Sequence, residues 1–331
     1  PRSRTLDSHE VAKADERFAA LDESKRAALS AIISTIPLFL VQGPPGVGKT
    51  RLVRDLVLDT LADNSSARLL LTAQSNAAVN HLMDELADAL EGHPREPVIV
   101  RSQSKDNKRD AGNFEVVRQT ESLIAKLAAS PLVAEAPQRL RRQLGDLQAS
   151  MATRPKEERP SVTQGRQAME ALLVRGANLL FATTNSPELE RLLDEHSQFD
   201  WVMVEEAGKA TGGELLAPLL LSYRRLMIGD HKQLAPFGSE RVVQLLANPQ
   251  AVSQALEAGA EFIGRTLRDM STDEVLDELD TDQSDFPALC TLALAQILLF
   301  ERMIEDEFKL HKNKPKARRL AQRLTLQHRM H

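Results

Sequence analysis

The residues with the clearest chemical purpose lie in a turn rich in glycine and proline. Residues 43–50 read Gly-Pro-Pro-Gly-Val-Gly-Lys-Thr, which fits the pattern G-x-x-x-x-G-K-[ST]. Glycines let backbone N–H groups approach phosphate oxygens, Lys49 can reach the β and γ phosphates, and the Thr50 hydroxyl can bind Mg²⁺. An apolar run precedes the turn and an amphipathic segment follows it. We therefore interpret the turn as a site for a nucleoside triphosphate; the alternative is a surface turn that carries a lysine.

Two later segments could supply the rest of a hydrolytic site. The apolar run 201–204 ends in Glu205 and Glu206, which could hold Mg²⁺ and act as a general base. The run 225–229 is followed by Asp230 and Gln233. A glutamine amide at that position can bond both a γ-phosphate and the attacking water.

The elements that must position these residues alternate along the chain. Short apolar runs alternate with amphipathic segments such as 51–62 and 76–90. This alternation predicts an α/β fold with a parallel sheet covered by helices on both faces. The predicted strands are 38–42, 68–73, 97–101, 178–183, 201–205 and 225–229.

Two long stretches interrupt this alternation. Residues 102–176 are charged and helical in pattern and predict a helical insertion, whereas residues 238–295 include an acidic run and predict a second insertion. We assign residues 1–20 to an N-terminal extension, and residues 21–101 and 177–237 to the core domain. Residues 296–331 would return to the core and begin a second domain. We expect the chain to be an excerpt of a longer protein.

Composition excludes some classes of protein. The 331 residues are 42% apolar and 27% charged, with a formal net charge of −5, so any nucleic-acid binding requires a local groove. The single cysteine, Cys290, excludes a disulfide framework and a cysteine-rich metal site, and its apolar surroundings predict a buried thiol. No uncharged apolar stretch of 18 residues predicts a membrane span, and no signal-peptide core is present. We expect a cytoplasmic or nuclear location.

Taken in order, these segments resemble the first RecA-like domain of superfamily 1 helicases, and in particular the up-frameshift branch that includes the nonsense-mediated decay helicase. "VQGPPGVGKT" resembles motif I and "LLLTAQSNAAVNHL" resembles motif Ia. "NLLFATTNSPEL" is similar to motif Ic, "VMVEEAGKAT" to motif II and "MIGDHKQLAPF" to motif III. "LTLQHRMH", at the end of the chain, resembles the start of motif IV. The resemblance implies a RecA-like P-loop NTPase domain that carries a helical insertion.

The resemblance also implies a role for each matching residue. ATP would contact the phosphate loop and an upstream residue, namely Gly43, Pro44, Pro45, Gly46, Val47, Gly48, Lys49, Thr50 and Lys25. Mg²⁺ would be held by Thr50 and Glu205. Catalysis would involve Lys49, Glu206 as general base, Gln233 as γ-phosphate sensor, and Arg329 from the second domain. The nucleic-acid backbone would contact Ser75, Asn76 and Thr183.

Three departures from the family pattern bear on activity. Glu205 stands where motif II usually has aspartate, and Lys25 aligns with the glutamine that normally reads adenine. Lysine only donates hydrogen bonds, whereas adenine recognition requires a donor and an acceptor, so the residue pattern does not determine which base is bound. Motifs V and VI are absent from these 331 residues, so this portion alone should bind nucleotide but hydrolyse it poorly.

Two functional hypotheses follow. The first is an ATP-dependent helicase or translocase that moves on single-stranded RNA or DNA. The alternative is an ATP-gated nucleic-acid clamp or scaffold with weak or no unwinding. Protein partners could dock on residues 238–295. An NTPase that acts only on protein is disfavoured by "AQSNAAVNHL" and "LQHRMH".

Overall fold

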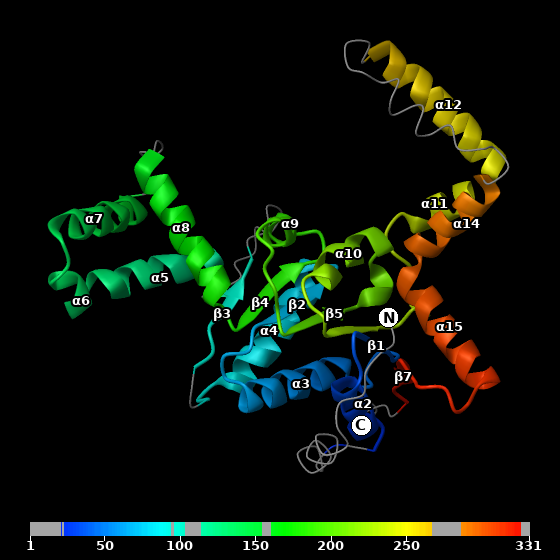
Figure 1. Cartoon of the computed structure of the whole chain (residues 1–331), viewed down its shortest axis with the longest axis horizontal. Coiled ribbons are helices and arrows are strands. Elements are labelled where there is room, and N and C mark those ends of the chain that lie inside the picture. Colours follow the sequence, from blue (N-terminus) through cyan, green and yellow to red (C-terminus); the bar gives the residue numbers. More distant parts are fainter. Residues whose placement is uncertain are drawn as a thin grey trace.

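Seven parallel strands form the centre of the molecule (Figure 1). The computed structural model describes residues 21, 23–93, 96–102, 114–153, 160–266 and 286–325. The strands lie in the order β3-β4-β2-β5-β6-β1-β7. Their bounds are β1 (Leu38–Gln42), β2 (Leu69–Ala73), β3 (Ile99–Arg101), β4 (Leu179–Thr183), β5 (Trp201–Glu205), β6 (Arg225–Gly229) and β7 (Ala321–Arg323). All six predicted strands are confirmed, and β7 is an additional strand that the sequence analysis did not predict.

The predicted coverage of both sheet faces is confirmed. Along β2, Leu69 and Leu71 join one buried apolar cluster and Leu70 joins the other, as the period of two in a strand requires. The first cluster includes α2 (Glu23–Ser34), α3 (Lys49–Asp63) and α4 (Asn76–Leu90). The second includes α9 (Pro187–Asp194), α10 (Gly212–Leu220) and α15 (Leu299–Asn313). Figure 1 shows α2, α3 and α4 below the sheet and α9 and α10 above it.

In its described residues, the region predicted as a helical insertion contains four helices beside the β3 edge of the sheet. They are α5 (Val116–Ala128), α6 (Pro131–Ala134), α7 (Gln138–Thr153) and α8 (Pro160–Gly176). α5 packs against both α7 and α8, and the buried side chains Ile124, Leu144 and Leu147 lie in this small bundle. The bundle projects from one end of the molecule (Figure 1).

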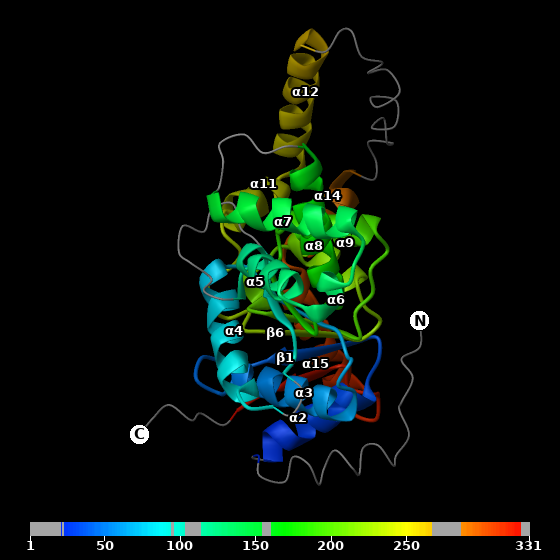
Figure 2. The same cartoon turned by 90° about the vertical axis from the view of Figure 1, so that its left-hand side faces the viewer.

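A second group of helices projects from the opposite end. It comprises α11 (Ser239–Leu246), α12 (Pro249–Thr266) and α14 (Phe286–Ile297). Figures 1 and 2 both show α12 extending away from the sheet. α14 joins this group to the core at Gly212, where an added Cβ would lie 2.1 Å from the carbonyl oxygen of Gln296. Cys290 on α14 is a buried free thiol, as predicted.

The last helix and strand return to the sheet. β7 pairs in parallel with β1, and Leu324 N–H donates to the Gln42 carbonyl at 2.8 Å. Among the described residues, no single helix has the length and apolar character needed to cross a bilayer. α14 and α15 would reach that length only as a pair, and the two are bent by 95°.

Candidate nucleotide and nucleic-acid site

Most of the predicted site residues that the structure describes lie at one edge of the sheet. Parallel pairing sets Gln42 beside Gly229, and it sets Ala73 between Glu205 and Thr183. The carboxyl ends of β1, β2, β4, β5 and β6 therefore meet at one edge, where open α/β sheets bind ligands. Arg329 lies outside the described residues.

The phosphate loop joins the end of β1 to the first turn of α3. Gly46 and Gly48 both have φ of 81°, in the left-handed region that favours glycine. Lys49 is the first residue of α3, and its ammonium donates to the carbonyl oxygens of Gly43 at 2.8 Å and Pro44 at 3.0 Å. Burial lowers the pKa of Lys49, and the nearby carboxylates of Asp230, Glu205 and Glu206 oppose that effect. The lysine is thus held over a loop whose form suits a phosphate group.

Lys25 is brought to the phosphate loop by α2. Its side chain is buried, which is rare for lysine. A Cβ added to Gly48 would lie 3.0 Å from Lys25 Cε and 3.1 Å from its Nζ, so the lysine covers the loop beside Gly48. This position is compatible with a contact to a bound nucleotide. Its role in reading the base stays a prediction.

Glu205 and Thr50 form an oxygen-rich pair suited to Mg²⁺. Glu205 ends β5 with only 6% of its surface exposed. Burial raises its pKa to about 7, and a hydrogen bond from the Thr50 side chain opposes the rise. Its Oε1 is buried and has no hydrogen-bond partner among the described residues. A buried carboxylate oxygen without a partner, beside a threonine hydroxyl, fits a hard divalent cation.

Glu206 leaves the strand in an unusual conformation. Its φ of 53° and ψ of 33° lie in the left-handed region, which interrupts the alternation of the strand. The following 3-10 turn, η2 (Ala207–Lys209), packs closely against β6, because a Cβ on Gly229 would lie 2.9 Å from Gly208 N. In this turn the Lys209 ammonium pairs with Glu206 Oε1 at 2.8 Å, and both side chains are about one-third exposed. Sequence analysis missed Lys209, whose only signal is its spacing of three from Glu206.

Gln233 is held by Asp230 just beyond β6. Its Nε2 donates to Asp230 Oδ2 at 3.0 Å, while Gln42 Nε2 donates to Asp230 Oδ1 at 3.2 Å. Burial alone would raise the pKa of Asp230, but the hydrogen bonds from Gln233, the Lys232 backbone and Gln42 outweigh it and hold that pKa below its usual value. Asp230 is therefore a carboxylate that positions the predicted sensor.

The three predicted nucleic-acid residues lie at or just beyond the carboxyl ends of β2 and β4. Ser75 caps α4 by accepting a bond from Ala78 N–H, and Asn76 begins that helix. Thr183 ends β4, next to Ala73 on β2. These two strand ends lie side by side on the β3 side of Glu205.

Arg101 is a further residue at this edge that sequence analysis did not single out. It ends β3 with 2% of its surface exposed. Its guanidinium donates to the side chains of Asn76 at 2.6 Å and Asn80 at 3.3 Å, and to the carbonyls of Ser102 and Phe181. The only available signal was an arginine directly after the apolar run "VIV". Arg101 therefore orients the side chain of Asn76.

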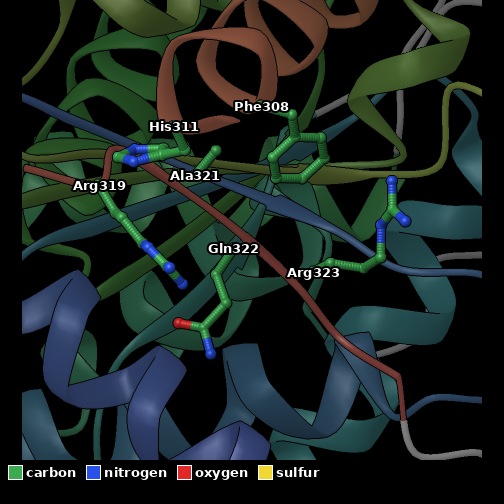
Figure 3. Close-up of a pocket in the computed structure, with 6 residues that line it drawn as sticks. All are labelled: Phe308, His311, Arg319, Ala321, Gln322 and Arg323. Carbon is green, nitrogen blue, oxygen red and sulfur yellow. The ribbon is translucent and has the colours of Figure 1, made fainter. Parts of the chain in front are cut away.

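A separate pocket lies between α15 and β7 (Figure 3). None of its lining residues is among those predicted for the site. They are Phe308, His311, Arg319, Ala321, Gln322 and Arg323.

The fold and the site together define a P-loop NTPase domain. A family model described as "AAA domain" matches residues 20–159 and 99–239, which together span about two thirds of the chain. The chain belongs to this AAA domain family and is a RecA-like domain of the up-frameshift-like superfamily 1 helicases.

Several curated proteins are similar to this chain. ATP-dependent helicase NAM7 of Saccharomyces cerevisiae is 29% identical over 233 residues, which cover 68% of this chain and 21% of that protein. DNA-binding protein SMUBP-2 of Rattus norvegicus is 26% identical, and the match covers 65% of this chain and 22% of that protein. A regulator of nonsense transcripts 1 homolog of Neurospora crassa is 26% identical, and the match covers 65% of this chain and 18% of that protein. The chain thus spans about a fifth of the length of these relatives.

One solved structure aligns over most of the chain. It is a nuclease-deletion mutant of the Type ISP restriction-modification enzyme LlaGI in complex with a DNA substrate mimic. The alignment covers 94% of this chain and 27% of that one, at 12% identity and a TM-score of 0.34, which is too low to bear on the fold.

Proposed function

We propose that this chain is the ATP-binding domain of a superfamily 1 helicase or translocase, which hydrolyses ATP with Mg²⁺ and moves on single-stranded RNA or DNA. One observation supports this most directly. The phosphate loop, Glu205, Glu206 and Gln233 share a sheet edge with Ser75 and Thr183. A nucleotide and a nucleic-acid strand could therefore bind side by side on one rigid element.

Each residue at the nucleotide would have a distinct task. The backbone of the phosphate loop and Lys49 would bind the β and γ phosphates. Thr50 and Glu205 would hold Mg²⁺, which would neutralise phosphate charge. Glu206 Oε1 is anchored by Lys209, so Oε2 would accept the proton of the attacking water. Gln233 would contact the γ-phosphate, and Arg329 would approach it from a second domain.

The nucleic-acid contacts would be independent of sequence. Ser75, Asn76 and Thr183 are small polar side chains, which suit phosphate and sugar rather than base edges. Arg101 accounts for the orientation of Asn76, since its guanidinium donates to Asn76 Oδ1. A generic single strand is the expected track.

A second candidate function is an ATP-gated nucleic-acid clamp with weak hydrolysis. Glu205 favours it, because this glutamate is one methylene longer than the aspartate usual in motif II and would displace a direct Mg²⁺ ligand. In this case nucleotide binding, rather than turnover, would control the grip on the strand.

ATP hydrolysis by the full chain would separate the two functions. We would measure it with no nucleic acid, with single-stranded RNA and with single-stranded DNA, and use Lys49→Ala as the control without phosphate binding. A rise of about tenfold with one polymer, roughly 1.4 kcal/mol of coupling, would support a motor and identify its track. Background hydrolysis despite measurable ATP binding would refute the motor and support the clamp.

A further inference from the structure

A chain of side-chain hydrogen bonds runs from Gln233 to the edge strand β7. Gln233 donates to Asp230 at 3.0 Å, and Gln42 donates to the other oxygen of Asp230 at 3.2 Å. Arg323 Nε then donates to Gln42 Oε1 at 2.7 Å. These four residues, here called the polar network, connect the loop after β6, the end of β1 and the end of β7.

The orientation of the Gln42 amide is set by opposite charges on its two sides. Its NH₂ group faces the Asp230 carboxylate and its oxygen faces the Arg323 guanidinium. Rotating the amide by 180° would place oxygen against carboxylate and NH₂ against guanidinium, so only one orientation satisfies both neighbours. Gln42 and Asp230 are 4% and 8% exposed, so water cannot readily replace the contact between them, whereas Arg323 and Gln233 lie at the exposed ends of the polar network.

Arg323 is itself held in place from two directions. Its guanidinium carbon lies 5.0 Å from the centre of the Phe308 ring on α15, and Figure 3 shows both side chains at the pocket. The adjacent Leu324 N–H bonds to the Gln42 carbonyl at 2.8 Å, which ties the backbone of β7 to β1. The position of β7 therefore determines where the charged end of the polar network lies.

We propose that Arg323 is a positioning residue that acts through Gln42 and Asp230 on Gln233, and so couples γ-phosphate recognition to the placement of β7. The proposal rests on the proposed function, in which Gln233 contacts the γ-phosphate. With Arg323 in place, Asp230 keeps both of its side-chain donors and Gln233 stays fixed. Without it, Gln42 Oε1 loses its charged donor, Gln42 is free to reorient, and Asp230 no longer holds Gln233 in one position.

The test measures how well the chain distinguishes a non-hydrolysable ATP analogue from ADP. We expect Arg323→Met, which removes both the charge and the donor, to lower the ratio of the two affinities by about three- to tenfold, while ADP affinity changes little. Arg323→Lys, which keeps a donor and the charge, should restore part of the ratio. The matched control is Arg319→Met, which removes the same charge from an exposed residue of the same segment and leaves the polar network intact. Thermal unfolding would confirm that each variant is folded.

A merely structural role for Arg323 would give a different pattern. If Arg323→Met weakened the binding of both nucleotides equally, or left the ratio unchanged, the proposal would be wrong while the proposed function stood. If Arg319→Met lowered the ratio as much, general charge near β7 would explain the effect and the polar network would not. If the unaltered chain bound neither nucleotide, the proposed function would fail and this inference with it.

Discussion

Replacing Glu205 by glutamine should stabilise the nucleotide-free protein at neutral and alkaline pH. Burial raises the pKa of Glu205 from 4.5 to about 7, so folding disfavours its ionised form. A carboxyl group whose pKa is higher in the folded state contributes its full share of the folding free energy below pH 4.5. That contribution is lost as the pH rises from 4.5 to 7. The loss is about 1.4 kcal/mol per pH unit across this window, and it reaches about 3 kcal/mol above pH 7. Glutamine has the shape of the protonated acid and carries no charge at any pH.

The assay is chemical denaturation of the unaltered chain and of Glu205→Gln between pH 5.5 and 8.5. The difference in the free energy of unfolding should favour the variant, and it should grow by about 2 kcal/mol across this range. Glu206→Gln is the control, since its one-third exposed carboxylate pairs with Lys209 and its loss should change stability by less than about 1 kcal/mol. The stabilised Glu205→Gln variant should also lose Mg²⁺-dependent ATP hydrolysis, because the neutral amide is a weaker ligand for Mg²⁺.

A constant difference between the two proteins across this pH range would refute the reasoning. So would a Glu205→Gln variant that is less stable than the unaltered chain at pH 8.5. Either result would mean that burial does not penalise the Glu205 carboxylate and that its Oε1 finds a partner in solution.

Three other substitutions have defined outcomes. Gly48→Ala places a Cβ at a residue with φ of 81°, and this Cβ would lie 3.0 Å from the buried lysine of α2. We therefore expect the free energy of unfolding to fall by about 1–2 kcal/mol, measured by thermal denaturation, and ATP binding to become much weaker, measured by calorimetry. Lys209→Ala removes the partner of Glu206, so kcat should fall roughly tenfold with little change in nucleotide affinity, and an unchanged kcat would show that the ion pair is only a surface contact. Gly212→Ala brings a methyl group to within 2.1 Å of a carbonyl oxygen of α14, so proteolysis of residues 238–297 should accelerate while ATP binding persists.

Local sequence patterns were enough to select most residues of the candidate nucleotide site. The phosphate loop is recognisable because a helix start, two left-handed glycines and a lysine must follow one another within eight residues. Glu205 and Gln233 were found because each follows a continuous apolar run, which is typical of a strand buried on both faces. Parallel strands then bring such residues to one edge, so their grouping followed from the fold class.

Contacts between distant segments were decided only by the tertiary structure. Arg323 and Gln42 are 281 positions apart, and no local pattern shows that they bond. β7 has three residues and a mixed composition, so it becomes a strand only because β1 offers it a partner. Arg101 reads as the end of an ordinary strand until the chain places Asn76 beside it. Hydrophobic periodicity, turn residues and motif spacing are local properties that can be read from a sequence. The partner of a buried polar group depends instead on which distant segments the fold brings together.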